Sequence, residues 1–222
     1  QLAVLTTAQM VAMGSDQVKT LSTAQLASIK ATTLTAMETG DFAALTTAQM
    51  AGLTPAQVTA LTTAQVVALT TAQTANLSSR QLTALTTAQI AQMETSDIEA
   101  IAATQIGGLT PAQVSAFSAL QLAKVTTAQL ASMTAKQVAS IDAADVATLS
   151  TSQISALTTA QINGLTTSQI SSMTIAHIGV LSADQVKAMS TGSLGALSAS
   201  QKSTLTDTQK AGLTSLQKSI LG

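Results

Sequence analysis

The stretch LTTAQVVA, from Leu61 to Ala68, is the clearest copy of a unit that repeats every eight residues along this 222-residue chain. We number the positions of this octad 1 to 8, starting at the leucine. Position 1 holds a large apolar residue in all 28 of its occurrences, from Leu5 to Leu221. Such strict periodicity predicts a stack of small, similar parts that stabilise one another, and not a globule built around one active site.

Each octad carries a signal for starting a helix. Position 2 is Ser or Thr in 21 of 27 octads, and position 5 is Gln in 21 of 27. This spacing is a capping box: the hydroxyl accepts from the backbone N–H three residues on, and the Gln side chain accepts from the N–H of the cap residue. Position 6 is apolar in 23 of 27 octads. Positions 1 and 6 are therefore expected to form the hydrophobic staple that accompanies such a start.

Proline and glycine support the same frame. Pro55 and Pro111 both fall at position 3, the first helical residue, where a missing N–H costs nothing. Glycines gather at positions 7 and 8, where a short helix would end. They are Gly52, Gly107, Gly108, Gly164, Gly179, Gly195 and Gly212.

These features predict an all-α fold, a right- or left-handed α-solenoid of short helices of one to two turns, one per octad. A single long helix is excluded, because its apolar residues would drift about 80° around the axis with each octad. A β-solenoid stays open as the alternative, since Thr, Val and Ile suit strands. No octad is expected to fold alone, because ordering eight residues costs on the order of 12 kcal/mol and two buried large side chains return roughly 3–6 kcal/mol.

The array is expected to have two parts. Residues 1–196 are predicted to form a continuous octapeptide-repeat solenoid, and residues 197–222 to form divergent C-terminal repeats. In the latter, lysine takes the apolar position 6, at Lys202, Lys210 and Lys218. These lysines are expected either to cap the solenoid or to form a junction with the next subunit. Both ends of the sequence fall within an octad, which suggests excision from a longer parent.

Composition argues against several classes of function. Charged residues make up 9% of the chain and the net charge is −1, a poor match for nucleic acid or anionic membranes. Two Phe, with no Trp or Tyr, leave almost no stacking platform for bases or sugars. Cysteine is absent, and no apolar run approaches the length of a membrane span. Because enzyme motifs are missing as well, we expect neither catalysis nor a cofactor.

A few octads depart from the pattern at the cap positions. Three of them are acidic at positions 2 and 5: Glu38 with Asp41, Glu94 with Asp97, and Asp142 with Asp145. We interpret them as alternative helix starts, because the helix dipole favours carboxylates there. Paired oxygens also make these six residues candidate calcium ligands, although two carboxylates are too few alone. His177, the one histidine, replaces Gln at position 5 and is interpreted as a polar cap substitute, because no catalytic partner accompanies it.

The phrase L-[ST]-T-x-Q-[VI]-x-[AG]-L, found at residues 61–69 and 157–165, resembles octapeptide arrays in very large repetitive surface proteins of Gram-negative bacteria. Those proteins are of the adhesin-like and hemolysin type, and the resemblance covers essentially the whole chain. It implies an extracellular or cell-surface structural or adhesive protein. The glycine-aspartate nonapeptides that bind Ca²⁺ in many hemolysin-type proteins do not occur here, which argues against a calcium-dependent fold.

We therefore expect a non-enzymatic extracellular structural protein, a stiff repeat rod that forms a filament, stalk or sheath with itself as partner. The alternative is an adhesin-type binding module that presents a repetitive surface to a receptor or glycan. The near-absence of aromatic and Arg anchors counts against that alternative. A third hypothesis is ice binding by regularly spaced Thr hydroxyls, although many of them are committed to capping.

Overall fold

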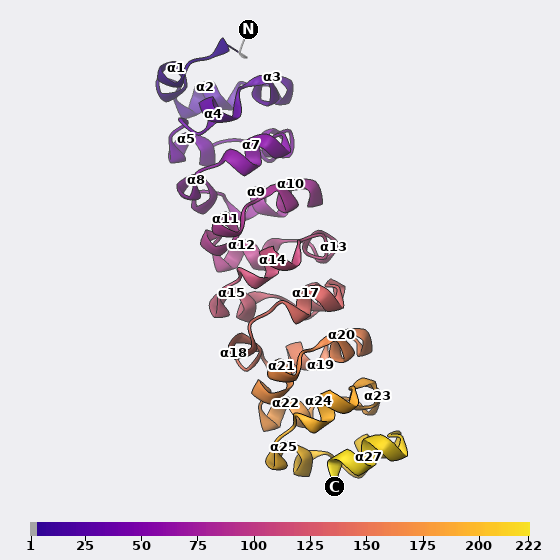
Figure 1. Ribbon diagram of the computed structural model, residues 1–222. Helices are drawn as coiled ribbons and strands as arrows, with labels where there is room; N and C mark the ends of the chain where they lie inside the picture. Colours follow the sequence, from indigo (N-terminus) through magenta and orange to yellow (C-terminus); the bar gives the residue numbers. More distant parts are fainter. Residues whose placement is uncertain (1–3) are drawn as a thin grey trace. The chain divides into compact units, whose positions relative to one another are not determined.

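The computed structural model describes residues 4–222, which fold into 27 short α-helices with no strand among them. The backbone divides into two compact units, unit 1 ending at Leu109 and unit 2 running from Thr110 to Gly222. Within each unit the helices follow one another in a regular coil (Figure 1). Each unit is an α-solenoid with one helix of one to two turns per octad, so the predicted fold class is confirmed and the β-solenoid alternative is wrong.

Unit 1 contains α1 (Thr7–Val11), α2 (Ser15–Lys19), α3 (Thr23–Ser28), α4 (Ala31–Leu34), α5 (Thr39–Ala43), α6 (Thr47–Ala51), α7 (Pro55–Ala60), α8 (Thr63–Val67), α9 (Thr71–Ala75), α10 (Ser79–Ala84), α11 (Thr87–Gln92), α12 (Thr95–Ala100) and α13 (Ala103–Ile106). Unit 2 contains α14 (Pro111–Ser115), α15 (Ala119–Lys124), α16 (Thr127–Ser132), α17 (Ala135–Ala139), α18 (Ala143–Val146), α19 (Thr151–Ser155), α20 (Thr159–Gly164), α21 (Thr167–Ser172), α22 (Ile175–Gly179), α23 (Ala183–Ala188), α24 (Thr191–Gly195), α25 (Ala199–Thr204), α26 (Asp207–Ala211) and α27 (Ser215–Leu221).

The backbone restarts where the sequence predicts. Thr62 has an extended conformation, φ −69° and ψ 154°, directly before α8. Its Oγ1 accepts the Gln65 N–H at 3.1 Å, and Gln65 Oε1 accepts the Thr62 N–H at 3.1 Å. Thr158 has the same conformation and the same capping box before α20. Helices α7 and α14 begin at Pro55 and Pro111, so the predicted helix starts are confirmed.

Two glycines at helix ends allow close approach between turns. Gly52 follows α6 with φ −81° and ψ −11°, a right-handed conformation. Among residues 4–222 only Gly222 has a positive φ. The glycines at positions 7 and 8 therefore mark helix ends without adopting the left-handed conformation that usually explains glycine there. A Cβ on Gly52 would lie 2.9 Å from Thr23 Cβ, and one on Gly164 would lie 2.9 Å from Ala135 Cβ. Both of these neighbours belong to the preceding turn of the coil.

Within each unit, most helices pack against the third helix after them. In unit 1, α4 contacts α7 and α7 contacts α10; in unit 2, α17 contacts α20 and α20 contacts α23. Helices α17, α20 and α23 lie one above another along one side of unit 2 (Figure 1). One turn of the coil therefore holds about three octads. Residues that meet across turns are then some 25 to 31 positions apart in the sequence.

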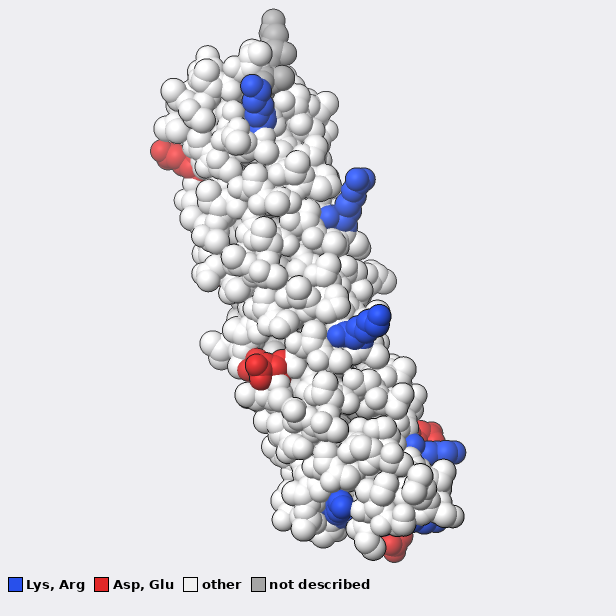
Figure 2. All heavy atoms as spheres, viewed as in Figure 1, with Lys and Arg blue, Asp and Glu red and all other residues white. Residues whose placement is uncertain are grey.

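Positions 1 and 6 form the interior of both units, as the predicted staple requires. Leu61 and Val66, the two apolar residues of one staple, are both buried, as are Leu157 and Ile162 of another. The outside carries few charges, since charged residues make up 9% of the chain. Figure 2 shows isolated basic and acidic side chains separated by wide uncharged stretches. None of the helices formed by residues 4–222 has the length and apolar character needed to cross a bilayer.

Candidate functional site

The glutamine at position 5 bonds in two directions. In the α20 octad, Gln161 Oε1 accepts the Thr158 N–H at 2.7 Å, which completes the capping box. Its Nε2 donates to Leu130 O at 2.8 Å and to Met133 O at 2.7 Å, in the preceding turn. The side chain is 1% exposed. One buried amide therefore starts its own helix and also fixes that helix to the turn before it.

This glutamine bridge recurs at constant spacing. Gln57 Nε2 donates to Leu26 O at 2.8 Å and to Ile29 O at 2.9 Å, 31 and 28 residues earlier. Carbonyls at the end of a helix lack a full set of partners within that helix, and the bridge gives the Ile29 carbonyl its donor. The Leu26 carbonyl also accepts the Ile29 N–H at 3.1 Å. Further glutamines donate to the position-1 carbonyl 28 residues earlier. They are Gln49, Gln65, Gln73, Gln81, Gln89, Gln105, Gln153, Gln169, Gln185, Gln201, Gln209 and Gln217.

The capping half of the bridge is predictable from the sequence, but the half that joins the turns was not predicted. A capping box accepts Glu as readily as Gln, yet no octad has Glu at position 5. Only the amide combines an acceptor with a donor; a carboxylate has acceptors alone. The consistent choice of Gln over Glu is the signal that could have revealed the second bond.

His177 reproduces both halves of the glutamine bridge. The Thr174 N–H donates to Nδ1 at 3.3 Å, and Nε2 lies 2.8 Å from Leu149 O, 28 residues earlier. A neutral ring with its proton on Nε2 satisfies both contacts, since Nδ1 then accepts and Nε2 donates. The ring is buried at 4% exposure. The interpretation of His177 as a polar cap substitute is confirmed.

His177→Gln is expected to leave the free energy of unfolding within about 0.5 kcal/mol of the wild-type value, because the amide replaces both ring contacts. Urea unfolding followed by circular dichroism measures the change. His177→Leu is the control and is expected to cost about 2–3 kcal/mol, because it leaves the Thr174 N–H and the Leu149 carbonyl unpaired. Equal losses in the two variants would contradict the bridging role.

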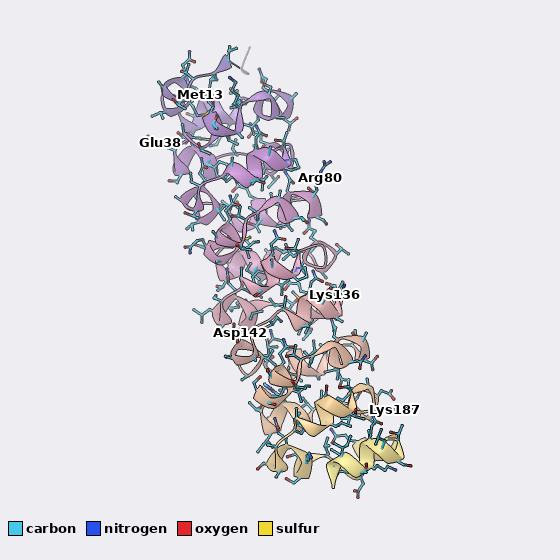
Figure 3. All side chains as sticks on the ribbon, viewed as in Figure 1. Met13, Glu38, Arg80, Lys136, Asp142 and Lys187 are labelled. Atoms are coloured by element: carbon cyan, nitrogen blue, oxygen red, sulfur yellow. The ribbon has the colours of Figure 1, made fainter. Side chains whose placement is uncertain are left out.

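The acidic N-cap residues differ in whether they cap. Asp142 Oδ1 accepts the Ala144 N–H at 3.0 Å, so the predicted helix start is confirmed there. Glu38 and Glu94 occupy the N-cap positions of α5 and α12 without a side-chain cap hydrogen bond. Aspartate is a preferred N-cap residue and glutamate is not, because its longer side chain fits the local geometry less well. Figure 3 shows Glu38 on unit 1 and Asp142 on unit 2, both exposed.

At position 5 of two of the three acidic octads, a hydroxyl group of the preceding turn bonds to the carboxylate. Ser15 Oγ donates to Asp41 Oδ1, and Thr71 hydrogen-bonds to Asp97; each hydroxyl lies 26 residues earlier. In these two octads the position-5 side chain therefore accepts a hydrogen bond from the preceding turn, whereas glutamine donates one to it. Asp145 is half-buried. Among residues 4–222, no group of three or more His, Asp or Glu is placed to hold a metal ion, so the calcium candidates remain three separate pairs.

Asp97 is the most deeply buried acidic side chain among residues 4–222. It is 1% exposed, and its Oδ2 has no hydrogen-bond partner. The pKa of this carboxyl is raised from 3.8 to about 6, chiefly by burial; the hydrogen bond from Thr71 lowers the pKa in part, and the negative charge of Glu94 adds to the rise. An isolated buried carboxylate is costly, so burial shifts the equilibrium toward the neutral form.

The lysines at position 6, which we call the C-terminal lysines, lie in the last three helices. They are Lys202 in α25, Lys210 in α26 and Lys218 in α27. Lys202 Nζ donates to Ile220 O at 2.7 Å, close to the end of α27. Lys202 and Lys210 are half-buried and Lys218 is exposed, as expected of lysines whose stems cover apolar surface. The three helices keep the octad register. The division of the array after residue 196 and the role of these lysines in a subunit junction remain predictions.

Comparison with known protein families detects the octad itself. A search of curated proteins gave no match. Residues 34–71 in unit 1 and 138–175 in unit 2 match the family model described as ALTTAQ repeat. The two segments lie in different units and share the same capping box, staple and glutamine bridge. The chain is therefore a repeat protein, with one segment similar to the ALTTAQ repeat in each of its units.

Proposed function

We propose that this chain is a non-enzymatic structural array whose turns build a filament, stalk or sheath at the cell surface or outside the cell. The observation that carries the proposal is the glutamine bridge. Its donor and acceptors recur at the same octad positions in turn after turn. A further turn can therefore be added with the same set of hydrogen bonds. Arrays held together by nearest-neighbour interfaces of this kind can be extended to any length.

The hydroxyl groups of the chain support a structural role. Thr62, Thr158 and Ser182 each use the side-chain oxygen to cap a helix. A nucleophilic hydroxyl needs an adjacent base, and both ring nitrogens of His177 are bonded to the backbone. The same commitment to capping counts against ice binding, which would need ordered hydroxyls free to face solvent.

The residues at the surface favour a structural role over a role in binding a partner. The two phenylalanines are the only aromatic residues, and both Phe42 and Phe117 are buried. Exposed aromatic and Arg anchors dominate most binding hot spots, and here a single Arg is present. Placement at the cell surface rests on the likeness of the octapeptide to arrays in Gram-negative surface proteins.

Negative-stain electron microscopy and sedimentation velocity of the full chain, over a range of concentrations, test the proposal. We expect particles of constant width that join end to end as the concentration rises, because heterologous contacts generate open filaments. Single particles of one size at every concentration would overturn the assembly. Saturable binding to a glycan array would instead favour the adhesin-type alternative.

Replacing the C-terminal lysines by isoleucine is expected to strengthen association, because isoleucine would restore the apolar position 6 of the other octads. Sedimentation velocity should then show larger species at lower concentration than in the wild type. The same change at three exposed lysines outside position 6, namely Lys30, Lys124 and Lys136, is the matched control. If the C-terminal variant loses the association that the wild type shows, the lysines themselves form the junction.

A further inference from the structure

At position 97, as at Asp41 and Asp145, an acid stands where most octads have glutamine, a hydrogen-bond donor. In each glutamine bridge an amide N–H donates to the position-1 carbonyl 28 residues earlier. For position 97 that carbonyl belongs to Leu69, and an ionised carboxylate has no proton to donate to it. The Oδ2 atom of Asp97 is buried and unpartnered. This octad therefore lacks the hydrogen that glutamine supplies elsewhere.

Few charged groups near Asp97 in unit 1 could balance the negative charge of its ionised carboxylate. Helix α9, which packs against α12, contains no charged residue. Within α12 and its N-cap the other charged groups are Glu94 and Glu99, both acidic and exposed. Between residues 63 and 106 the one basic residue is Arg80, which is exposed and lies at the outer edge of unit 1 (Figure 3). Ionised Asp97 would therefore be a buried charge without a counterion in this part of unit 1.

We infer that Asp97 is a buried proton-binding site, and that its neutral carboxyl, protonated on Oδ2, is the form that joins α12 to the preceding turn. The O–H group supplies the donor that an amide supplies in other octads, while Thr71 remains bonded to the carboxyl. Loss of the proton to solvent leaves an uncompensated charge between two turns. The raised pKa of Asp97 is the expected consequence of this arrangement.

The sign of the pH dependence follows directly. In the unfolded chain the pKa of Asp97 is 3.8, and in the fold it is about 6. Between these values the folded state keeps a proton that the unfolded state has lost, so this group's contribution to stability falls as the pH rises from about 4 to about 6. A difference of about two pKa units corresponds to a change of about 100-fold in the folding equilibrium constant.

Urea unfolding of the full-length wild type and of Asp97→Gln, from pH 4 to pH 8, tests the inference. Asp97→Gln introduces the residue that most octads have at position 5. Asp97→Asn is a second variant, in which the size of the side chain is unchanged. The folding equilibrium constant of each variant, divided by that of the wild type, is expected to rise about 100-fold between pH 4 and pH 7. A carbon-13 NMR titration of the Asp97 carboxyl should have its midpoint near pH 6.

Asp145→Gln is the matched control, because it makes the same change at the same octad position. Asp145 is half-buried, so water reaches its carboxyl and we expect a smaller change of the ratio with pH. A ratio independent of pH for Asp97→Gln, or an NMR midpoint near 4, would overturn the inference. If Ca²⁺ or Na⁺ at pH 8 stabilises the wild type but not Asp97→Gln, the site takes a metal cation in place of the proton.

Discussion

Gln161→Glu is expected to lower the free energy of unfolding by about 4 kcal/mol at pH 7. The substitution keeps the size of the side chain and keeps an oxygen for the Thr158 N–H, since Glu also serves in a capping box. It removes the donor to Leu130 O and Met133 O and replaces it with a carboxylate at a site that is 1% exposed. Urea unfolding followed by far-UV circular dichroism measures the loss.

Gln9→Glu is the matched control for this prediction. Gln9 occupies the same octad position in α1, and its Oε1 accepts the Thr6 N–H at 2.9 Å. The side chain is exposed, so a carboxylate there stays hydrated and benefits from the helix dipole. We expect a change within about 0.5 kcal/mol. A similar loss at both positions would contradict the argument that the bond between turns stabilises the array.

Leu130→Ala is expected to lower the free energy of unfolding by about 2–5 kcal/mol. Leu130 lies at position 6 of its octad in α16 and is 0% exposed, so truncation leaves a cavity in the interior of unit 2. The backbone carbonyl that accepts from Gln161 is unchanged by the substitution, so the effect reports side-chain packing alone. Thermal and urea unfolding both measure it.

Leu120→Ala is the control for packing, because it makes the same change ten residues earlier, in α15. Leu120 is 75% exposed and contributes little to the interior. Surface substitutions of this kind usually change stability by no more than about 0.5 kcal/mol. A loss at Leu120 comparable to that at Leu130 would mean that this exposed face is covered in solution, for instance by a second copy of the chain.

The sequence by itself determined the local structure of most octads. The capping box at Thr62 and Gln65, the staple of Leu61 with Val66, and the helix start at Pro55 all depend on residues fewer than eight positions apart. Such short-range interactions are fixed by backbone geometry. The position of most helices and the identity of the apolar interior residues were therefore predictable before any tertiary structure was known.

The tertiary structure alone decided how the octads pair. The bond from Gln161 to Leu130, the close approach of Gly164 to Ala135 and the burial of Asp97 all involve residues 26 to 31 positions apart. A periodic sequence makes many registers look alike, because any octad presents nearly the same apolar and polar groups to any other. The number of octads in a turn is set by how helices of this length pack side by side, and it is this packing that brings one amide to the carbonyls of the turn before.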